Sequence, residues 1–181
     1  LLGVRVRAIG AALGRRRRPV PWIAPDIVPG QVYRTLTGVP GKTGVIYTLD
    51  RETGRFLWAR PTVRQNLVAD IDGASGRVTV NPATVPVAYG VEHAICPGPT
   101  GGANYMTGSY NPDNHTLFLP LLATCATMTA LDPASGTAGT YAMANRIVID
   151  PEAGGLRGTI HAVDAVTGQT RWVHRQRGGM Q

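Results

Sequence analysis

Two cysteines are the residues of this chain whose type could most readily support metal or redox chemistry. Cys96 and Cys125 are the only cysteines among 181 residues. Two isolated thiols cannot complete a four-ligand zinc site, and Cys-Pro-Gly-Pro at 96–99 is neither a redox Cys-x-x-Cys nor a haem-attachment motif. The spacing leaves two equal alternatives, a disulfide that closes a long loop and a pair of buried thiols. A disulfide would stabilise the fold by about 3–4 kcal/mol and would indicate an oxidising compartment.

A glycine pair followed by an amide and an aromatic residue lies between the cysteines. The sequence reads Gly-Gly-Ala at 101–103, then Asn104 and Tyr105. The glycines permit a close backbone approach, at which the Asn104 amide can both donate and accept hydrogen bonds. The alternative is a turn in which Asn104 only tolerates the left-handed conformation, and the residues alone favour that turn.

The histidines show no spacing typical of metal ligands. There are four of them, at positions 93, 115, 161 and 174, and two lie in or beside predicted strands. We therefore expect surface or turn histidines with satisfied hydrogen bonds.

These candidate residues are embedded in a turn signature that recurs four times. The pattern small-x-Asp-x-x-Thr-Gly-x-x-x-Trp occurs at 48–58 and 162–172, and shorter copies occur at 72–76 and 132–136. Self-similarity of this kind is typical of repeat architectures. The Asp accepts hydrogen bonds from turn amides, and the Gly adopts a positive φ without strain. We expect each copy to be a β-hairpin whose Trp packs between neighbouring units, in an all-β chain.

The positive charge is confined to the start of the chain. The net charge is +7, and arginines at 5, 7 and 15–18 supply six of the positive charges. Without interleaved aromatic residues or a recognisable module, this basic run does not indicate a nucleic-acid partner. The run follows the apolar stretch instead of preceding it, so no secretory signal peptide is visible. We expect residues 1–40 to be an irregular, basic and Pro-rich head, and 41–181 to form the domain.

Several segments resemble the pyrroloquinoline-quinone-dependent (quinoprotein) alcohol and methanol dehydrogenases. Gly-Lys-Thr-Gly-Val-Ile-Tyr-Thr-Leu-Asp-Arg at 41–51, the stretch from Cys96 to Cys125, and the hairpin at 164–172 match family segments in order. The resemblance covers about 41–176. It implies a partial β-propeller, about three blades of an eight-bladed quinoprotein propeller with tryptophan-docking hairpins.

The resemblance also implies roles for individual residues. Lys42 matches the cation that contacts the ortho-carbonyl oxygens of the quinone, where it would stabilise the negative charge that develops during reduction. Asn104 matches an amide that hydrogen-bonds the quinone, and Tyr105 occupies a position that lines the substrate cavity. Cys96 and Cys125 match a structural disulfide.

The family reaction implies cofactors, partners and a compartment. The cofactors are pyrroloquinoline quinone and calcium, the substrate is a small primary or secondary alcohol, and the electron acceptor is a cytochrome c or a membrane quinone. The compartment is the periplasm. The family's catalytic aspartate and calcium ligands belong upstream of Lys42, where this sequence does not resemble the family, so we expect the chain to be inactive alone.

The abrupt change near residue 40 points to a frame error or a truncated reading frame, in which case the head is not native sequence. The competing interpretation of the whole chain is a non-catalytic propeller scaffold with the same repeat. Such a scaffold has no reason to retain Lys42, Asn104 and the cysteine pair.

Overall fold

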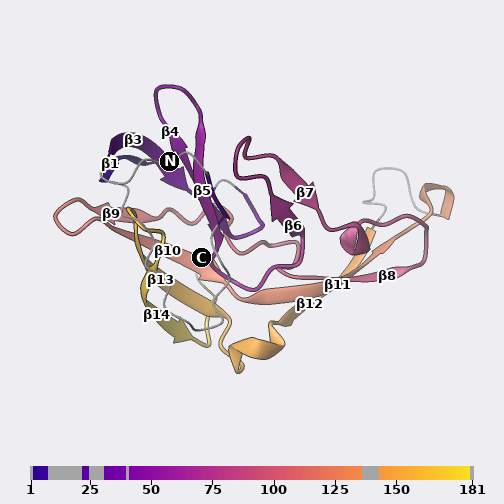
Figure 1. Cartoon of the computed structure of the whole chain (residues 1–181). Helices are drawn as coiled ribbons and strands as arrows, with labels where there is room; N and C mark the ends of the chain where they lie inside the picture. The colour runs from indigo at the N-terminus through magenta and orange to yellow at the C-terminus, as the bar shows by residue number, and fades with distance from the viewer. Residues whose placement is uncertain (1, 8–21, 25–30, 40, 136–142, 180–181) are drawn as a thin grey trace.

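The computed structural model describes residues 2–7, 22–24, 31–39, 41–135 and 143–179, and shows an all-β protein (Figure 1). Apart from three 3-10 turns (η1, Pro82–Thr84; η2, Pro133–Ser135; η3, Pro151–Ala153), the regular structure of these residues consists of antiparallel strands. None of the helical segments in the described residues is long and apolar enough to cross a membrane. The predicted fold class is confirmed.

The first blade sheet contains the first long copy of the repeat. Its strand order is β1-β3-β4-β5-β2, with β1 Leu2–Arg7, β2 Trp22–Ile23, β3 Val32–Gly38, β4 Val45–Asp50 and β5 Phe56–Pro61. β4 and β5 are the predicted hairpin, paired from Val45↔Pro61 to Leu49↔Phe56.

Our expectation of irregular structure before residue 41 is wrong for part of that region. β3 pairs with β4 from Thr35↔Asp50 to Gly38↔Tyr47, and β1 and β2 join the same sheet. β3 has the alternating burial of a strand, with Tyr33, Thr35 and Thr37 inside. The pattern escaped detection because two of its three buried positions are threonines, whose hydroxyls form buried hydrogen bonds with one another and with Thr48.

The second blade sheet contains the second long copy. Its order is β14-β13-β10-β9, with β9 Ser109–Asn111, β10 Thr116–Leu122, β13 Gly158–Asp164 and β14 Thr170–Gln176. β10 and β13 pair over seven residues, from Thr116↔Asp164 to Leu122↔Gly158.

The two blade sheets pack face to face through the main hydrophobic core. The first sheet contributes Tyr33, Ile46, Leu57 and Trp58 to this core, and the second contributes Leu117, Leu119, Leu121 and Val163. Neither sheet can bury its apolar face alone, which is the physical reason why the repeats stack. Partial propeller architecture is therefore confirmed, with two blade sheets and two smaller sheets.

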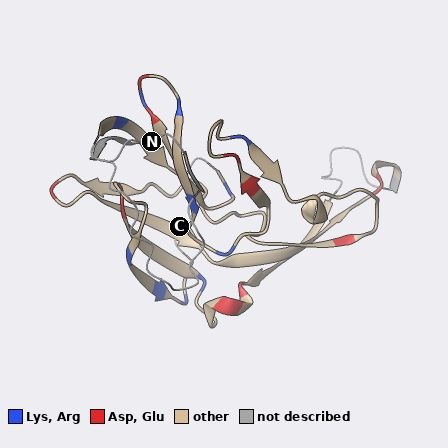
Figure 2. Cartoon of the chain, in the orientation of Figure 1, with Lys and Arg blue, Asp and Glu red and all other residues tan. Residues whose placement is uncertain are grey.

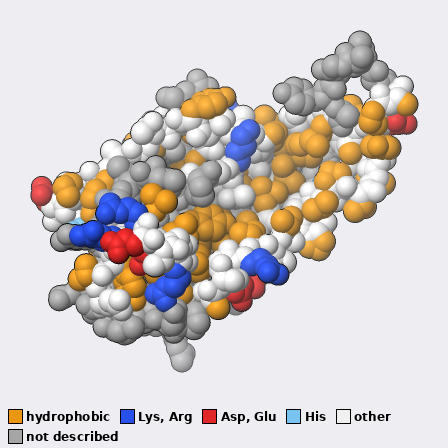
Figure 3. Space-filling view, turned by 90° about the horizontal axis from the view of Figure 1, so that it is seen from above, with side chains coloured by type: hydrophobic (Ala, Val, Ile, Leu, Met, Phe, Trp, Pro, Cys, Tyr) orange, Lys and Arg blue, Asp and Glu red, His pale blue; other side chains and the backbone are white. Residues whose placement is uncertain are grey.

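Of the two smaller sheets, one projects from the blade sheets as an arm (Figure 1), and the other, a side hairpin, packs on the first blade sheet through a buried cluster of Val45, Phe56, Ala59, Val68 and Ile71. The arm is the sheet β12-β11-β8, with β8 Glu92–Ile95, β11 Thr124–Ala130 and β12 Met143–Ile149, and the side hairpin pairs β6 Val68–Ile71 with β7 Val78–Val80. Apolar side chains are exposed on both, including Val80, Tyr89 and Ile147. Figure 3 shows hydrophobic side chains gathered over this part of the surface.

Three of the four predicted turns have the same hydrogen-bond pattern. Asp50, Asp72 and Asp164 each accept bonds from turn amides through the carboxylate, and each backbone carbonyl accepts from the Gly N–H four residues later at 2.8–2.9 Å. The three glycines, at 54, 76 and 168, have φ between 69° and 74°. In the fourth copy Asp132 accepts a bond from Ala134 N, and Gly136 lies outside the described residues.

The two tryptophans of the long repeats differ in their surroundings. Trp58 is 6% exposed and its ring lies against Gly168 of the other blade sheet, as predicted. Trp172 is 48% exposed and contacts Phe118 of its own sheet, with ring centroids 5.9 Å apart. Packing between units is therefore confirmed for Trp58, whereas Trp172 has no neighbouring unit against it in the described residues.

Candidate functional site

Lys42 lies in the loop between β3 and β4, where it contacts the loop that contains the glycine pair. Its exposed ammonium donates a hydrogen bond to the Pro99 carbonyl oxygen at 2.8 Å. Its own carbonyl accepts from Gly102 N at 2.8 Å, and the Gly102 carbonyl accepts from Leu122 N at 2.8 Å. Two segments that are 60 residues apart in sequence are thus joined to each other and to β10.

The glycine pair is required by this contact between protein segments. A Cβ on Gly101 would lie 2.7 Å from the Lys42 Cβ, and Gly101 has a φ of +81°. A Cβ on Gly102 would lie 2.7 Å from the Val63 side chain and 3.1 Å from the Gly44 Cα. The close backbone approach predicted from the sequence therefore occurs, and the approaching group is the 42–44 loop.

Asn104 and Tyr105 follow the pair at the surface. Ala103 is buried in the main core, whereas the Asn104 side chain is exposed and Tyr105 is 89% exposed. The chain thus leaves the packed glycine contact and presents an amide and a phenol to solvent. These side chains are accessible to a ligand, and no described group covers the phenol.

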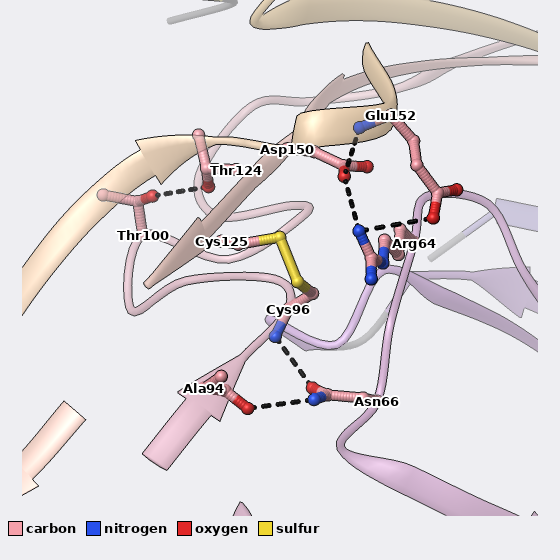
Figure 4. The surroundings of a disulfide bond; sticks show 9 residues. All are labelled: Arg64, Asn66, Ala94, Cys96, Thr100, Thr124, Cys125, Asp150 and Glu152. Carbon is pink, nitrogen blue, oxygen red and sulfur yellow. Dashed lines mark hydrogen bonds and ion pairs between the residues drawn. A yellow bond between two sulfur atoms is a disulfide. The ribbon is translucent and has the colours of Figure 1, made fainter. Parts of the chain in front are cut away.

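A disulfide joins Cys96 to Cys125 and fixes the start of the same loop (Figure 4). The Asn66 side chain forms two hydrogen bonds with the strand that leads to this cysteine. Cys96 N donates to Asn66 Oδ1 at 2.8 Å, and Asn66 Nδ2 donates to the Ala94 carbonyl at 2.9 Å. Gly98 N donates to the Thr124 carbonyl at 3.0 Å. The loop that reaches Lys42 is therefore anchored covalently to β11.

An ion-pair cluster beside the disulfide was not anticipated from the sequence. Arg64 Nη1 lies 3.2 Å from Asp150 Oδ1 and 3.3 Å from Glu152 Oε1 (Figure 4). Asp150 is 6% exposed, and its carboxylate also caps η3 by accepting from Glu152 N at 3.0 Å. Asp-Pro-Glu at 150–152 is an N-capping signal in the sequence, but its partner Arg64 is separated from it by 86 residues.

His161 contradicts the expectation of surface histidines. It is 6% exposed between the blade sheets, and within the described structure its Nδ1 has no hydrogen-bond partner. Burial, with the positive charges of Arg175 and Arg60, lowers its pKa from 6.5 to about 4. The side chain is therefore neutral at neutral pH. No sequence signal separated it from the other histidines, because its burial depends on the stacking of two sheets.

The described residues do not by themselves form a metal centre. No group of three or more His, Cys, Asp or Glu side chains among them is placed to hold a metal ion. Charged residues of both signs are scattered along the fold (Figure 2). The arginines at 15–18 lie outside the described residues, so the expectation of no nucleic-acid partner stays a prediction.

Comparison with known proteins connects this geometry to one group of enzymes. No protein-family model matches the chain. The dehydrogenase subunit of the quinone-type alcohol dehydrogenase of Acetobacter aceti is 33% identical over 93 residues, which are 51% of this chain and 12% of the relative. Lupanine 17-hydroxylase [cytochrome c] of a Pseudomonas species is 33% identical over 94 residues, 51% of this chain and 13% of the relative.

A solved structure supports the same relationship at the level of the fold. A europium-containing methanol dehydrogenase aligns with a TM-score of 0.72 and 24% identity, over 84% of this chain and 27% of that protein. In the first curated relatives, by contrast, the segment matched by this chain spans about an eighth of the length. This chain is similar in sequence to a segment of quinone-type alcohol dehydrogenases, and its fold is that of a segment of a methanol dehydrogenase.

Proposed function

We propose that this chain forms one side of the pyrroloquinoline quinone site of an enzyme that oxidises a small primary or secondary alcohol. One observation carries the proposal. Lys42 is the only lysine of the chain, and its exposed ammonium is held 2.8 Å from Pro99 O in the loop that leads to Asn104. The relatives named as quinone alcohol dehydrogenases support the assignment of the reaction class.

The donor set on this surface fits a quinone that bears carboxylates and carbonyl oxygens. An ammonium has three donors, and Pro99 occupies one of them, so two remain for carbonyl or carboxylate oxygens. The exposed Asn104 amide can donate to one ligand atom and accept from another. The quinone, when bound, supplies the acceptor for hydride. The residues of this chain would bind and orient it.

Each residue has a distinct task in this proposal. The Lys42 ammonium binds the carbonyl oxygens and stabilises the negative charge that grows on them, because a fixed cation needs no reorganisation as the charge develops. Asn104 orients the ring by its amide, and Tyr105 lines the substrate cavity. The disulfide holds the loop that positions Lys42 and Asn104 relative to each other.

We assign neither the calcium site nor the general base to the described residues. The described part of the chain offers no cluster of metal ligands. We assign the calcium ligands and the catalytic aspartate to other segments of the enzyme, and we expect this chain alone to bind the quinone without turning over alcohol.

The electron acceptor and the compartment follow from the same proposal. One relative carries cytochrome c in its name and four carry quinone, so the electron acceptor in this proposal is a cytochrome c or a membrane quinone. The disulfide supports an oxidising compartment, which for this class of enzyme is the periplasm.

Because Lys42 is the only lysine, its acylation gives a direct test. The folded chain is treated with an amine-selective acylating ester with and without pyrroloquinoline quinone, and peptide masses separate Lys42 from the terminal amine. We expect the quinone to slow Lys42 modification, and phthalate, a simple aromatic dicarboxylate, to give no protection. In equilibrium dialysis, Lys42→Gln should weaken quinone binding about tenfold or more, and Lys42→Arg should weaken it less.

Two controls complete the experiment. Asn104→Ala should reduce the protection of Lys42, whereas Tyr89→Ala, an exposed aromatic outside the site, should leave it unchanged. A folded chain whose disulfide is intact and whose Lys42 reacts at the same rate with and without quinone would overturn the proposal.

A further inference from the structure

The residues assigned to the quinone lie on two loops that a third segment joins. The lysine loop (41–44) precedes β4, and the glycine loop (96–108) connects β8 to β9. Both are contacted by the connecting segment (62–67), which lies between β5 and β6. Figure 4 shows Arg64 and Asn66 of this segment beside the disulfide. Residues of the connecting segment are therefore in a position to set how the two loops lie relative to each other.

Hydrogen bonds attach the connecting segment to each loop separately. Thr62 N donates to the Gly44 carbonyl oxygen at 3.0 Å, and the Thr62 hydroxyl donates to the same oxygen. Further along, Asn66 N donates to the Cys96 carbonyl oxygen at 2.9 Å, and Cys96 N donates to Asn66 Oδ1 at 2.8 Å. The two loops are thus attached to one short stretch of chain, which limits how far apart the attachment points can move.

Val63 lies between these attachment points and contacts both loops with a single methyl group. A Cβ on Gly44 would lie 2.7 Å from the Val63 Cγ2 atom, and a Cβ on Gly102 would lie 2.7 Å from the same atom. The methyl group therefore occupies the space that both glycines leave by lacking a side chain. Gly44 has a φ of +69°, so its backbone also favours glycine. Gly102 does not have a positive φ, and its lack of a side chain is explained by this packing.

The direct hydrogen bonds between the loops lie next to this methyl group. Gly102 N donates to the Lys42 carbonyl oxygen at 2.8 Å, and the Lys42 ammonium donates to the Pro99 carbonyl oxygen at 2.8 Å. Removal of the Val63 methyl groups would leave a void, which the loops could fill only by shifting. A shift of either loop would change the distance between the Lys42 ammonium and the Asn104 amide.

We propose that Val63 is a positioning residue of this site, which holds the lysine loop and the glycine loop at the separation that lets Lys42 and Asn104 bind one ligand. Val63 does not touch the ligand in this proposal and acts through the two loops. The identity of the ligand as the quinone rests on the proposed function, whereas the coupling of the loops through Val63 can be measured without quinone.

The first experiment compares Val63→Ala with a matched control, Val166→Ala, in the folded chain without quinone. Val166 is also partly buried against the main core but belongs to a turn of the second blade sheet, so both variants lose the same methyl groups from one core. Amide hydrogen exchange is followed residue by residue by NMR. The protection factor at position 102 should fall about tenfold in Val63→Ala and stay within about twofold of the parent in Val166→Ala. Acylation of Lys42 should become faster in Val63→Ala alone.

The second experiment measures the affinity for pyrroloquinoline quinone by equilibrium dialysis. Val63→Ala should weaken binding about tenfold, the loss expected when one hydrogen bond to a charged group is weakened, and Val166→Ala should change it by less than about twofold. A role limited to core stability would instead affect the two variants equally.

A third variant returns the lost volume from the opposite side of the contact. Gly102→Ala alone places its Cβ 2.7 Å from Val63 Cγ2 and should lower both protection at position 102 and quinone affinity. In Val63→Ala/Gly102→Ala the new Cβ enters the vacated space, so the double variant should recover part of both losses. Recovery should be partial, because the same Cβ would also lie 3.1 Å from the Gly44 Cα atom.

The outcomes separate this proposal from the proposed function. Unchanged exchange at position 102 in Val63→Ala, an equal loss of protection in Val166→Ala, or a double variant that is no better than Gly102→Ala would overturn the positioning role. So would a parent and a Val63→Ala variant that bind quinone equally tightly. A parent that binds no quinone would refute the proposed function, and the exchange and acylation results would then decide the coupling of the loops on their own.

Discussion

Adding one methyl group at each of two equivalent glycines measures how much tryptophan docking constrains the fold. Gly54 and Gly168 occupy the same position of the same turn, with φ of +74° and +69°. Alanine at either position takes on the left-handed strain, about 1–2 kcal/mol. Only at Gly168 does the new Cβ also meet a ring, at 2.9 Å from Trp58. Overpacking of this kind costs about 1–3 kcal/mol.

We therefore expect Gly168→Ala to destabilise the chain by about 2–5 kcal/mol and Gly54→Ala by about 1–2 kcal/mol. Urea unfolding of both variants with the disulfide intact gives the difference. In a Trp58→Leu background the smaller side chain can yield, so the difference should shrink towards zero. Equal losses for the two glycines in the parent would refute the docking of Trp58 on the turn.

Two further predictions concern pH and redox conditions. Burial, followed by the positive charges of Arg175 and Arg60, lowers the pKa of His161 from 6.5 to about 4. Between pH 4 and pH 6.5 the unfolded chain therefore binds a proton at this residue that the folded chain does not. Stability should therefore fall as the pH drops from 6.5 to 4, by up to about 3 kcal/mol, and His161→Gln should remove this part of the pH dependence in urea titrations at each pH. Reduction of the Cys96–Cys125 disulfide should lower the free energy of unfolding by about 3–4 kcal/mol, and a Cys96→Ser/Cys125→Ser variant that unfolds at the parent's urea midpoint would contradict this.

Local signals predicted the hairpins well and the polar interior poorly. Asp, Thr and Gly at fixed spacing determine a turn through bonds within five residues, so three of the copies could be located before the structure was known. Strand β3 was missed because its interior side is built on Thr35 and Thr37, whose burial becomes favourable only when Thr48 of the next strand shares their hydrogen bonds.

The candidate site shows the same division. The resemblance singled out Lys42 and Asn104, but neither residue type nor spacing could show that Gly101 and Gly102 pack on the lysine loop. The contact depends on the disulfide and on the stacking of strands from distant parts of the chain. The quinone roles of Lys42, Asn104 and Tyr105 stay predictions.

The sequence alone determined the repeat, the all-β class and the turn chemistry, because these depend on interactions between residues close in the chain. The tertiary structure decided which tryptophan is covered, which histidine is buried and what the glycine pair touches. Those outcomes depend on which sheet faces which, and two copies of one repeat, at 48–58 and 162–172, have different surroundings once they are stacked. Whether a side chain is buried depends on how the sheets pack against one another, and residue type alone does not specify it.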